Sequence, residues 1–395
     1  MKKTFIFSSF IVLSLCLISN VLAATADGWA SMASPYYSGT TGGTGGTVVT
    51  VNNYADLLYY AVTVGTTPYI IQVSGTIDIG YNLAVRANKT LIGIGENPTL
   101  KGDFGFDNDE GNIILENLNF TNPNDAGEGD GVSLKQNINN VFITKCTFYQ
   151  CFDGCLDISN NSDFVTVSWC KFYYTSDTGH NFVNLIGSSD DQPDDAANLR
   201  VTMHHNWWTT MCKERMPRVR YGQVHVYNNY YSNLMAGGYC VGVGCGSRIR
   251  VESNYFNAVP NPWANYYSSK PTYPVGHIGW NTGNIFYNCT QPSWATNEYS
   301  TIFTPPYSYT LDDAADLPAM VQAYAGAGTP YPPHWLYTVY GDFDRNDVVD
   351  IYDLATFANY WLGTDCAAIA DADFYADCIV NFREFTLLAE NWLVQ

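Results

Sequence analysis

The sequence has little positive charge. Of its 395 residues, 18 are Lys or Arg and 37 are Asp or Glu, which gives a formal net charge of -19. A protein that binds nucleic acid through the phosphates needs a basic face, so this balance excludes that class. Charged residues of both signs make up only 14%, whereas hydrophobic residues make up 46%, enough for a sizeable core. We therefore expect a folded protein that binds no nucleic acid.

Long hydrophobic runs are missing everywhere except near the N-terminus. There, Lys2 and Lys3 precede apolar residues 5–18, and Ala23 supplies the small residue typical of a cleavage site. We predict that residues 1–23 are a signal peptide and that the mature protein is secreted to the extracellular space. We expect no membrane span in the rest of the chain.

Helical patterns are also missing between about residues 112 and 286, where short alternating strands recur instead. Each copy ends in an aromatic residue, and successive aromatics are 23 to 36 residues apart. Repeats of this length predict a solenoid, in which each repeat buries its apolar face against its neighbours. Because no helices intervene, we predict an all-β parallel β-helix. The aromatic residues are Phe120, Phe148, Phe172, Trp208, Tyr231, Phe256 and Phe286.

Asparagine recurs in the last repeats, two residues before the aromatic, at Asn206, Asn229, Asn254 and Asn284. Asn is common in turns, but four copies in register predict a ladder of amide side chains stacked along the solenoid. The longest repeat carries an excursion at residues 187–195, which we expect to form a loop near the functional site.

The chain divides into four segments. Residues 1–23 are the signal peptide, 24–328 the solenoid, 329–340 a Pro-rich linker, and 341–395 a small acidic unit. The acidic unit has a helical rhythm in each of two similar halves. Its apolar positions are Leu354, Phe357, Ala358 and Trp361, then Phe385, Leu388, Ala389 and Trp392.

Four carboxylates occupy the turns of two adjoining repeats: Glu128, Asp130, Asp153 and Asp157. Strands of neighbouring repeats lie ~4.8 Å apart, so these side chains could converge. A hard cation that prefers oxygen ligands would relieve their mutual repulsion, and Ca²⁺ fits best. The alternative is a set of solvated turn acids.

Three arginines, Arg215, Arg218 and Arg220, follow within six positions of an otherwise acidic chain. Alternation places Arg218 and Arg220 on one face. Surface arginines paired with acids would explain them, but their position near the carboxylates favours a site. Ca²⁺ together with Arg is what the binding of a carboxylated sugar requires.

Several runs of sequence carry a more specific resemblance. They are VTMHHNWW at 201–208, ERMPRVRYG at 214–222, VHVYNN at 224–229, NFVNLIGSSD at 181–190 and NKTLIG at 88–93. In these runs the chain resembles the pectate lyases of polysaccharide lyase family 1. The resemblance implies a right-handed parallel β-helix that cleaves pectate (homogalacturonan, polygalacturonate) by Ca²⁺-dependent β-elimination, leaving unsaturated ends.

The resemblance also implies roles for single residues. Arg215 matches the catalytic base, and Arg220 matches the arginine that holds the substrate carboxylate. Arg218 is a further candidate substrate-binding residue. The residues that match the calcium ligands are Glu128, Asp130, Asp153 and Asp157.

One family feature is missing. Many members carry a Lys shortly before the Leu-x-Gly segment, where this chain has His180-Asn181-Phe182. Either His180 or Lys213 takes this substrate-binding role, or the substrate is held differently. The sequence leaves that role open.

The C-terminal unit resembles a dockerin, a small helical calcium-binding domain, which implies a cohesin-type protein partner. Oxygen ligands stand at loop positions suited to calcium. An acidic helical hairpin without metal is the alternative. The ligands of the first loop are Asp342, Asp344, Asn346, Asp350 and Asp353, and those of the second are Asp373, Asp377, Asn381 and Glu384.

Two other functions stay open at this point. Pectin-degrading hydrolases also use β-helices, but they need a cluster of Asp acids as acid and base and no Arg-Met-Pro-Arg motif. The third possibility is a non-catalytic carbohydrate-binding solenoid, which the missing Lys keeps open.

Overall fold

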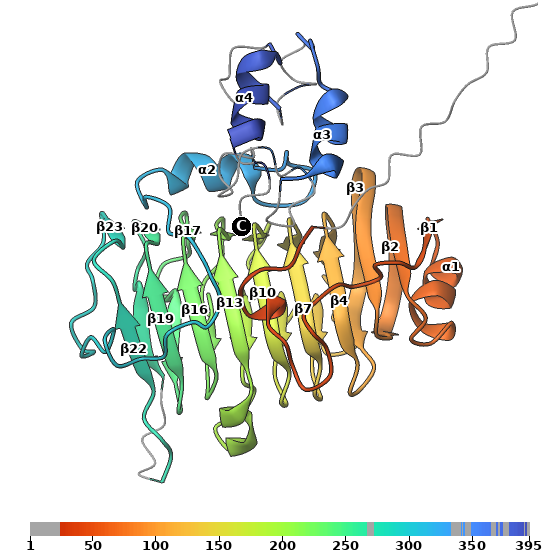
Figure 1. The fold of residues 1–395 in the computed structure, drawn as a ribbon. Helices are drawn as coiled ribbons and strands as arrows, with labels where there is room; N and C mark the ends of the chain where they lie inside the picture. The colour runs from red at the N-terminus through yellow and green to blue at the C-terminus, as the bar shows by residue number, and fades with distance from the viewer. Residues whose placement is uncertain are drawn as a thin grey trace, which may run out of the picture.

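The computed structural model describes residues 24–266, 272–332, 341, 343, 349–364, 369, 372–373, 379–390 and 392. Its main body is a parallel β-helix, as predicted: the paired strands all run parallel, and each coil contributes one strand to each of three faces (Figure 1). Within the described residues, no helix is long and apolar enough to cross a membrane.

Three stacks of strands form the faces, here called the first, second and third sheets. The first sheet contains β4 (Gly111–Glu116), β7 (Asn139–Thr144), β10 (Asp163–Ser168), β13 (Arg200–His204), β16 (Gln223–Tyr227), β19 (Arg248–Glu252) and β22 (His277–Trp280). The second contains β5 (Asn119–Thr121), β8 (Thr147–Tyr149), β11 (Lys171–Tyr173), β14 (Trp207–Trp208), β17 (Tyr230–Tyr231), β20 (Tyr255–Asn257) and β23 (Ile285–Tyr287). The third contains β6 (Val132–Leu134), β9 (Leu156–Ile158), β12 (Asn184–Ile186), β15 (Arg218–Val219), β18 (Val241–Gly244) and β21 (Trp263–Tyr266).

The N-terminal coils use longer strands. These are β1 (Thr47–Val51), β2 (Tyr69–Val85) and β3 (Lys89–Phe106), and β3 pairs in turn with β4, β5 and β6. The short helix α1 (Tyr54–Leu58) lies at this end of the solenoid (Figure 1).

The core consists of columns of stacked side chains. The predicted aromatic residues form one continuous stack, with successive ring centres 4.7 to 5.5 Å apart from Phe120 to Phe286. The predicted asparagine ladder is confirmed as well. The backbone N–H of Asn206 donates to Asn229 Oδ1, that of Asn229 to Asn254 Oδ1, and that of Asn254 to Asn284 Oδ1, each at 2.9 Å. In this way the ladder satisfies buried turn groups that would otherwise be costly.

Segments from both ends of the β-helix unit cover the outside of the solenoid. Residues 24–32, here called the N-terminal strap, cross the first sheet and include the turn Gly28–Ser31. The helix α2 (Leu317–Tyr324), which we did not predict, packs Leu317 and Val321 against Tyr230 of the second sheet.

The residues that follow α2 also pack on the solenoid. Lys145 Nζ donates to Thr329 Oγ1 and to the Pro330 carbonyl, both at 2.6 Å, and the Tyr331 hydroxyl bonds to Glu116. The packed segment therefore runs at least three residues past position 328, into the stretch expected to be linker.

Two helices are described in the C-terminal unit, α3 (Ile351–Ala358) and α4 (Phe382–Glu390). They match the two predicted helical rhythms, and Phe357 and Leu388 are buried in a small apolar core of their own.

Candidate active site

The third sheet presents a column of outward-facing side chains in register. Ser133 on β6 pairs with Asp157 on β9, Asp157 with Leu185 on β12, and Leu185 with Arg218 on β15. Adjacent strands are about 4.8 Å apart, so the carboxylate and the guanidinium groups lie roughly 10 Å apart along the column. One face therefore carries an acidic end and a basic end.

Two carboxylates are buried at the acidic end. Asp130 accepts hydrogen bonds from the Gly154 N–H at 3.0 Å and the Ser133 hydroxyl at 2.7 Å. Asp157 accepts one from the Leu185 N–H at 3.1 Å. These hydrogen bonds to strand and turn groups fix the positions of the carboxylate oxygen atoms.

Burial and mutual repulsion oppose ionisation of this pair. Burial raises the pKa of Asp130 to about 9, and the charges of Asp157 and Asp153 act in the same direction. Burial also raises the pKa of Asp157 to about 6, although the nearby charge of Arg215 opposes this. A cation beside the pair would favour the ionised form of both carboxylates.

The other two predicted calcium ligands have protein partners. Asp153 Oδ1 lies 2.8 Å from His180 Nε2. Glu128 is 64% exposed and forms an ion pair with Lys135, whose ammonium also lies 3.5 Å from Asp130 Oδ2. In the described part of the chain, no three or more His, Cys, Asp or Glu side chains are grouped closely enough to be an assembled metal site. The four-carboxylate site stays a prediction.

Sequence reasoning missed two charged residues beside the carboxylates, Lys135 and Asp103. Lys135 follows Ser133 at the alternation that places both on the outer face, so the strand pattern could have revealed it. Asp103 lies on β3, and burial raises its pKa. Asp103 comes close to the carboxylates only because of the register of β3 against β6, and no sequence pattern indicates this approach.

Two arginines at the basic end have nitrogen atoms available for a ligand. The Nε atoms of Arg215 and Arg218 are buried and, within the described residues, have no hydrogen-bond partner. The Arg215 guanidinium carbon lies 4.7 Å from the centre of the Phe182 ring, and that of Arg218 lies 4.8 Å from the Tyr266 ring. Burial lowers the pKa of Arg218, and the charge of Arg220 acts in the same direction.

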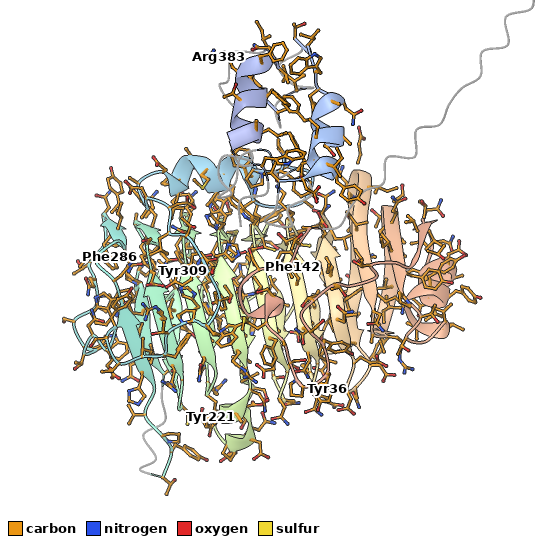
Figure 2. All side chains as sticks on the ribbon, in the orientation of Figure 1. Tyr36, Phe142, Tyr221, Phe286, Tyr309 and Arg383 are labelled. Atoms are coloured by element: carbon orange, nitrogen blue, oxygen red, sulfur yellow. The ribbon has the colours of Figure 1, made fainter. Side chains whose placement is uncertain are left out.

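The third arginine is held by the predicted excursion. Arg220 Nε donates to Asp190 Oδ1 and its Nη1 donates to the Gly187 carbonyl, both at 2.8 Å. The Tyr221 hydroxyl donates to the Asp190 carbonyl, and Figure 2 shows Tyr221 beside the loop that carries the short helix Pro193–Ala197. The excursion therefore lies at the site, as predicted, and fixes one arginine in it.

Both candidates for the missing Lys lie at the site. The His180 ring packs against Phe182, with ring centres 3.9 Å apart and the ring planes tilted by 51°. Burial lowers the pKa of His180, and the charge of Asp153 opposes this shift. Lys213 is close enough for its charge to act on His180. The structure therefore leaves the choice between them open.

A groove of about 340 Å³ continues the site towards the N-terminal coils. It is lined by Gly105 and Ser133, which pair in register, and by Tyr81, which has 76% of its surface exposed. Because Ser133 also belongs to the column that contains Asp157, the groove is continuous with the acidic end.

The described residues of the C-terminal unit form two matching helix starts. Asp353 accepts the Asp350 N–H at 2.9 Å, and Glu384 accepts the Asn381 N–H at 2.8 Å. Asp373 is described, whereas Asp342, Asp344, Asn346 and Asp377 lie outside the described residues. Calcium binding by this unit stays a prediction.

This arrangement can bind an acidic polymer in one orientation. Guanidinium groups supply paired donors for sugar carboxylates, and the carboxylates of the acidic end can share a cation with the same polymer. Between the two ends lies Leu185 on the outward face of β12.

Comparisons with known proteins agree with this geometry. The model of the family described as pectate lyase matches residues 3–329. A pectate trisaccharide-lyase of Thermotoga sp. (strain RQ2) is 33% identical over 319 residues, covering 73% of this chain and 85% of the relative. A pectate trisaccharide-lyase of Bacillus licheniformis is 31% identical over 309 residues, covering 74% and 85%.

A solved structure supports the same conclusion. A pectate lyase from Bacillus sp. N165 in complex with trigalacturonate is 27% identical and matches with a TM-score of 0.63, over 77% of this chain and 99% of that chain. Because the family model spans the whole β-helix and the relatives align along most of their length, this chain belongs to the pectate lyase family.

Proposed function

We propose that this pectate lyase is an exported enzyme that cleaves pectate by calcium-dependent β-elimination. One observation carries the proposal: Arg218 shares an outward column with Asp157, Arg215 lies close enough for its charge to act on Asp157, and the Nε atoms of both arginines are buried without a partner among the described residues. A hydrolase would need paired acids at the cleavage point, and here the arginines occupy that half of the column.

The residues at the acidic end fit a calcium ion. The four carboxylates supply oxygen atoms, as Ca²⁺ prefers, and Asp130 and Asp157 are buried where their charges repel each other. Asp130, Asp153 and Asp157 would hold the ion, with Glu128 as a further ligand once its pairing with Lys135 is released. A bound Ca²⁺ would neutralise the substrate carboxylate and so make the adjacent C5 proton more acidic.

The protein's own residues perform the remaining steps. Arg220, held by Asp190, binds the galacturonate carboxylate and stabilises the charge that develops on it. Arg215, once its guanidinium has given up a proton to solvent, removes the C5 proton and so becomes a cation again. The electron pair of that C–H bond forms the C4–C5 double bond, and the C4–O bond breaks, so that the leaving sugar takes the oxygen and then a proton.

The test is the appearance of unsaturated, ultraviolet-absorbing ends in digested polygalacturonate, with and without a chelator. We expect such ends with calcium and none in excess chelator. Reducing sugar without ultraviolet absorbance would indicate a hydrolase, and binding without either product would indicate a non-catalytic solenoid. Full lyase activity in excess chelator would contradict the proposed role of calcium but would still agree with the assignment as a lyase.

The C-terminal unit supports a second proposal, that it attaches the enzyme to a cohesin-type protein. Its helices share an apolar hollow of about 250 Å³, in which Trp361 takes part and Phe382 is 72% exposed. We expect calorimetry of the full chain with a cohesin to show calcium-dependent binding. Phe382→Ala should weaken that binding without changing pectate cleavage.

A further inference from the structure

The N-terminal strap is fixed to the first sheet by specific contacts. Trp29 N–H donates to Thr202 Oγ1 and Ala30 N–H donates to Thr166 Oγ1, both at 3.0 Å. Asp27 Oδ2 lies 2.9 Å from His204 Nε2. The strap therefore holds a defined course over β10 and β13.

The first residue of the strap, Ala24, contacts a buried carboxylate. The Ala24 nitrogen donates to Glu116 Oε2 at 2.8 Å, and Glu116, the last residue of β4, is only 1% exposed. The other oxygen, Oε1, accepts the Tyr331 hydroxyl. The Lys145 ammonium lies 5.2 Å from the centre of the same Tyr331 ring. Both ends of the β-helix unit thus meet at Glu116.

The sequence places the predicted cleavage site directly before Ala24. We propose that Glu116 is a binding site for the α-ammonium group of a chain that begins at Ala24, so that removal of the preceding segment completes the fold. Hydrolysis of the Ala23–Ala24 bond consumes one water, leaves a carboxylate on Ala23 and gives Ala24 an amine. The amine takes up a proton at neutral pH, since α-amino groups have pKa values near 8.

Cleavage changes the kind of contact that Glu116 makes. Before cleavage a neutral amide donates to the carboxylate; afterwards an ammonium does, and charge-assisted hydrogen bonds are about twice as strong. Ala24 and Ala26 also pack against Ile114 and Phe142 of the first sheet. The segment that carries the ammonium group is therefore already held in place by apolar contacts. The strap should therefore be held more firmly in the processed chain.

The experiment compares the chain that begins at Ala24 with the same chain carrying an extra Gly-Ser before Ala24, which moves the amine away from Glu116. The unextended chain should unfold at a temperature higher by on the order of 2–5 °C at pH 7. The difference should shrink above about pH 8, because a group whose pKa is raised by a partner loses its contribution as pH rises through that pKa. Equal midpoints would overturn the proposal.

Two variants locate the effect. In Glu116→Gln the extension should no longer matter, whereas in Tyr331→Phe, which removes the hydrogen bond from the Tyr331 hydroxyl to Glu116, the difference should persist. An undiminished difference in Glu116→Gln would contradict the proposal. The mass of the exported protein should correspond to a first residue of Ala24, and any other first residue would also overturn it. Because none of these measurements uses pectate, their outcome is independent of the enzyme's activity.

Discussion

At the residue scale, the three arginines have different surroundings, so their roles can be separated. Arg215 and Arg218 stack on aromatic rings with their Nε atoms unpartnered among the described residues, whereas Arg220 is bonded to Asp190 and Gly187. This supports a role in proton transfer for Arg215 and a fixed, carboxylate-binding role for Arg220.

Arg215→Lys tests the proton transfer. Lysine keeps the positive charge but changes the reach and the fork of donors, so kcat should fall by on the order of 10² or more, the range for a positioned proton acceptor. KM should barely change. Arg220→Lys is the comparison, because it should raise KM and lower kcat together. Near-normal turnover in Arg215→Lys would assign the base elsewhere, with His180 and Lys213 as the next candidates.

Asp190 is expected to act through Arg220. In Asp190→Ala the guanidinium loses its Nε acceptor, so KM should rise about tenfold, which is the loss of one charge-assisted hydrogen bond. Asp190→Glu should restore part of the affinity. In an Arg220→Lys background the Asp190→Ala change should cost little further, because the bond it removes is already absent. Independent, additive losses would contradict a positioning role.

At the element scale, the side-chain columns inside the coils satisfy buried backbone groups and so stabilise the fold. Asn229 accepts the buried Asn206 N–H and donates to the Met203 carbonyl. Asn229→Ala should therefore leave several buried groups unpaired and lower the free energy of unfolding by about 2–4 kcal/mol. Asn52→Ala, at an exposed position, is the control and should cost little. Denaturant unfolding of both variants measures the difference, and equal stabilities would show that the ladder is dispensable.

The covered face of the first sheet should make the protein sensitive to acid. Burial lowers the pKa of His225 to about 4, although its partner Glu252, 2.6 Å away, opposes this. A group that is neutral when folded and protonated when unfolded makes stability fall as pH falls from about 6.5 to 4, by up to about 1.4 kcal/mol per pH unit for one proton. His225→Gln should flatten that slope. His277→Gln, at an exposed histidine paired with Glu298, should leave it unchanged.

Sequence reasoning recovers the elements whose side chains repeat. The aromatic positions and the asparagines recur once per coil, because every coil must fill the same place in the stack. The strap, α2 and the approach of Asp103 to Asp130 have no such period, since they depend on contacts between segments about 30 to 200 residues apart. The arginine motif indicated the site through its local concentration of positive charge, whereas Lys135, which the strand alternation could have revealed, was found only in the structure.

At the scale of the whole molecule, the β-helix unit ends later than its sequence suggests. A truncation after Pro332 keeps the Lys145 contacts with Thr329 and Pro330 and should retain full pectate cleavage. A truncation after Gly328 removes those acceptors and Tyr331, so its unfolding temperature should fall by several degrees. Both chains lack the C-terminal helices. Loss of cleavage by the folded longer chain would show that the C-terminal unit takes part in catalysis.

The meeting of Ala24 and Tyr331 at Glu116 also changes how this solenoid can come apart. Repeat proteins usually fray from their terminal coils, because each coil contacts only its neighbours. Here both ends of the unit are hydrogen-bonded to one residue at the end of β4, away from the last coil. Neither end can detach without giving up its hydrogen bond to Glu116, and this bond does not depend on the outermost coils. Unfolding of a terminal coil therefore need not release the end of the unit, and a released end need not unfold the coil. We expect the two to be separate starting points for unfolding and for attack by proteases.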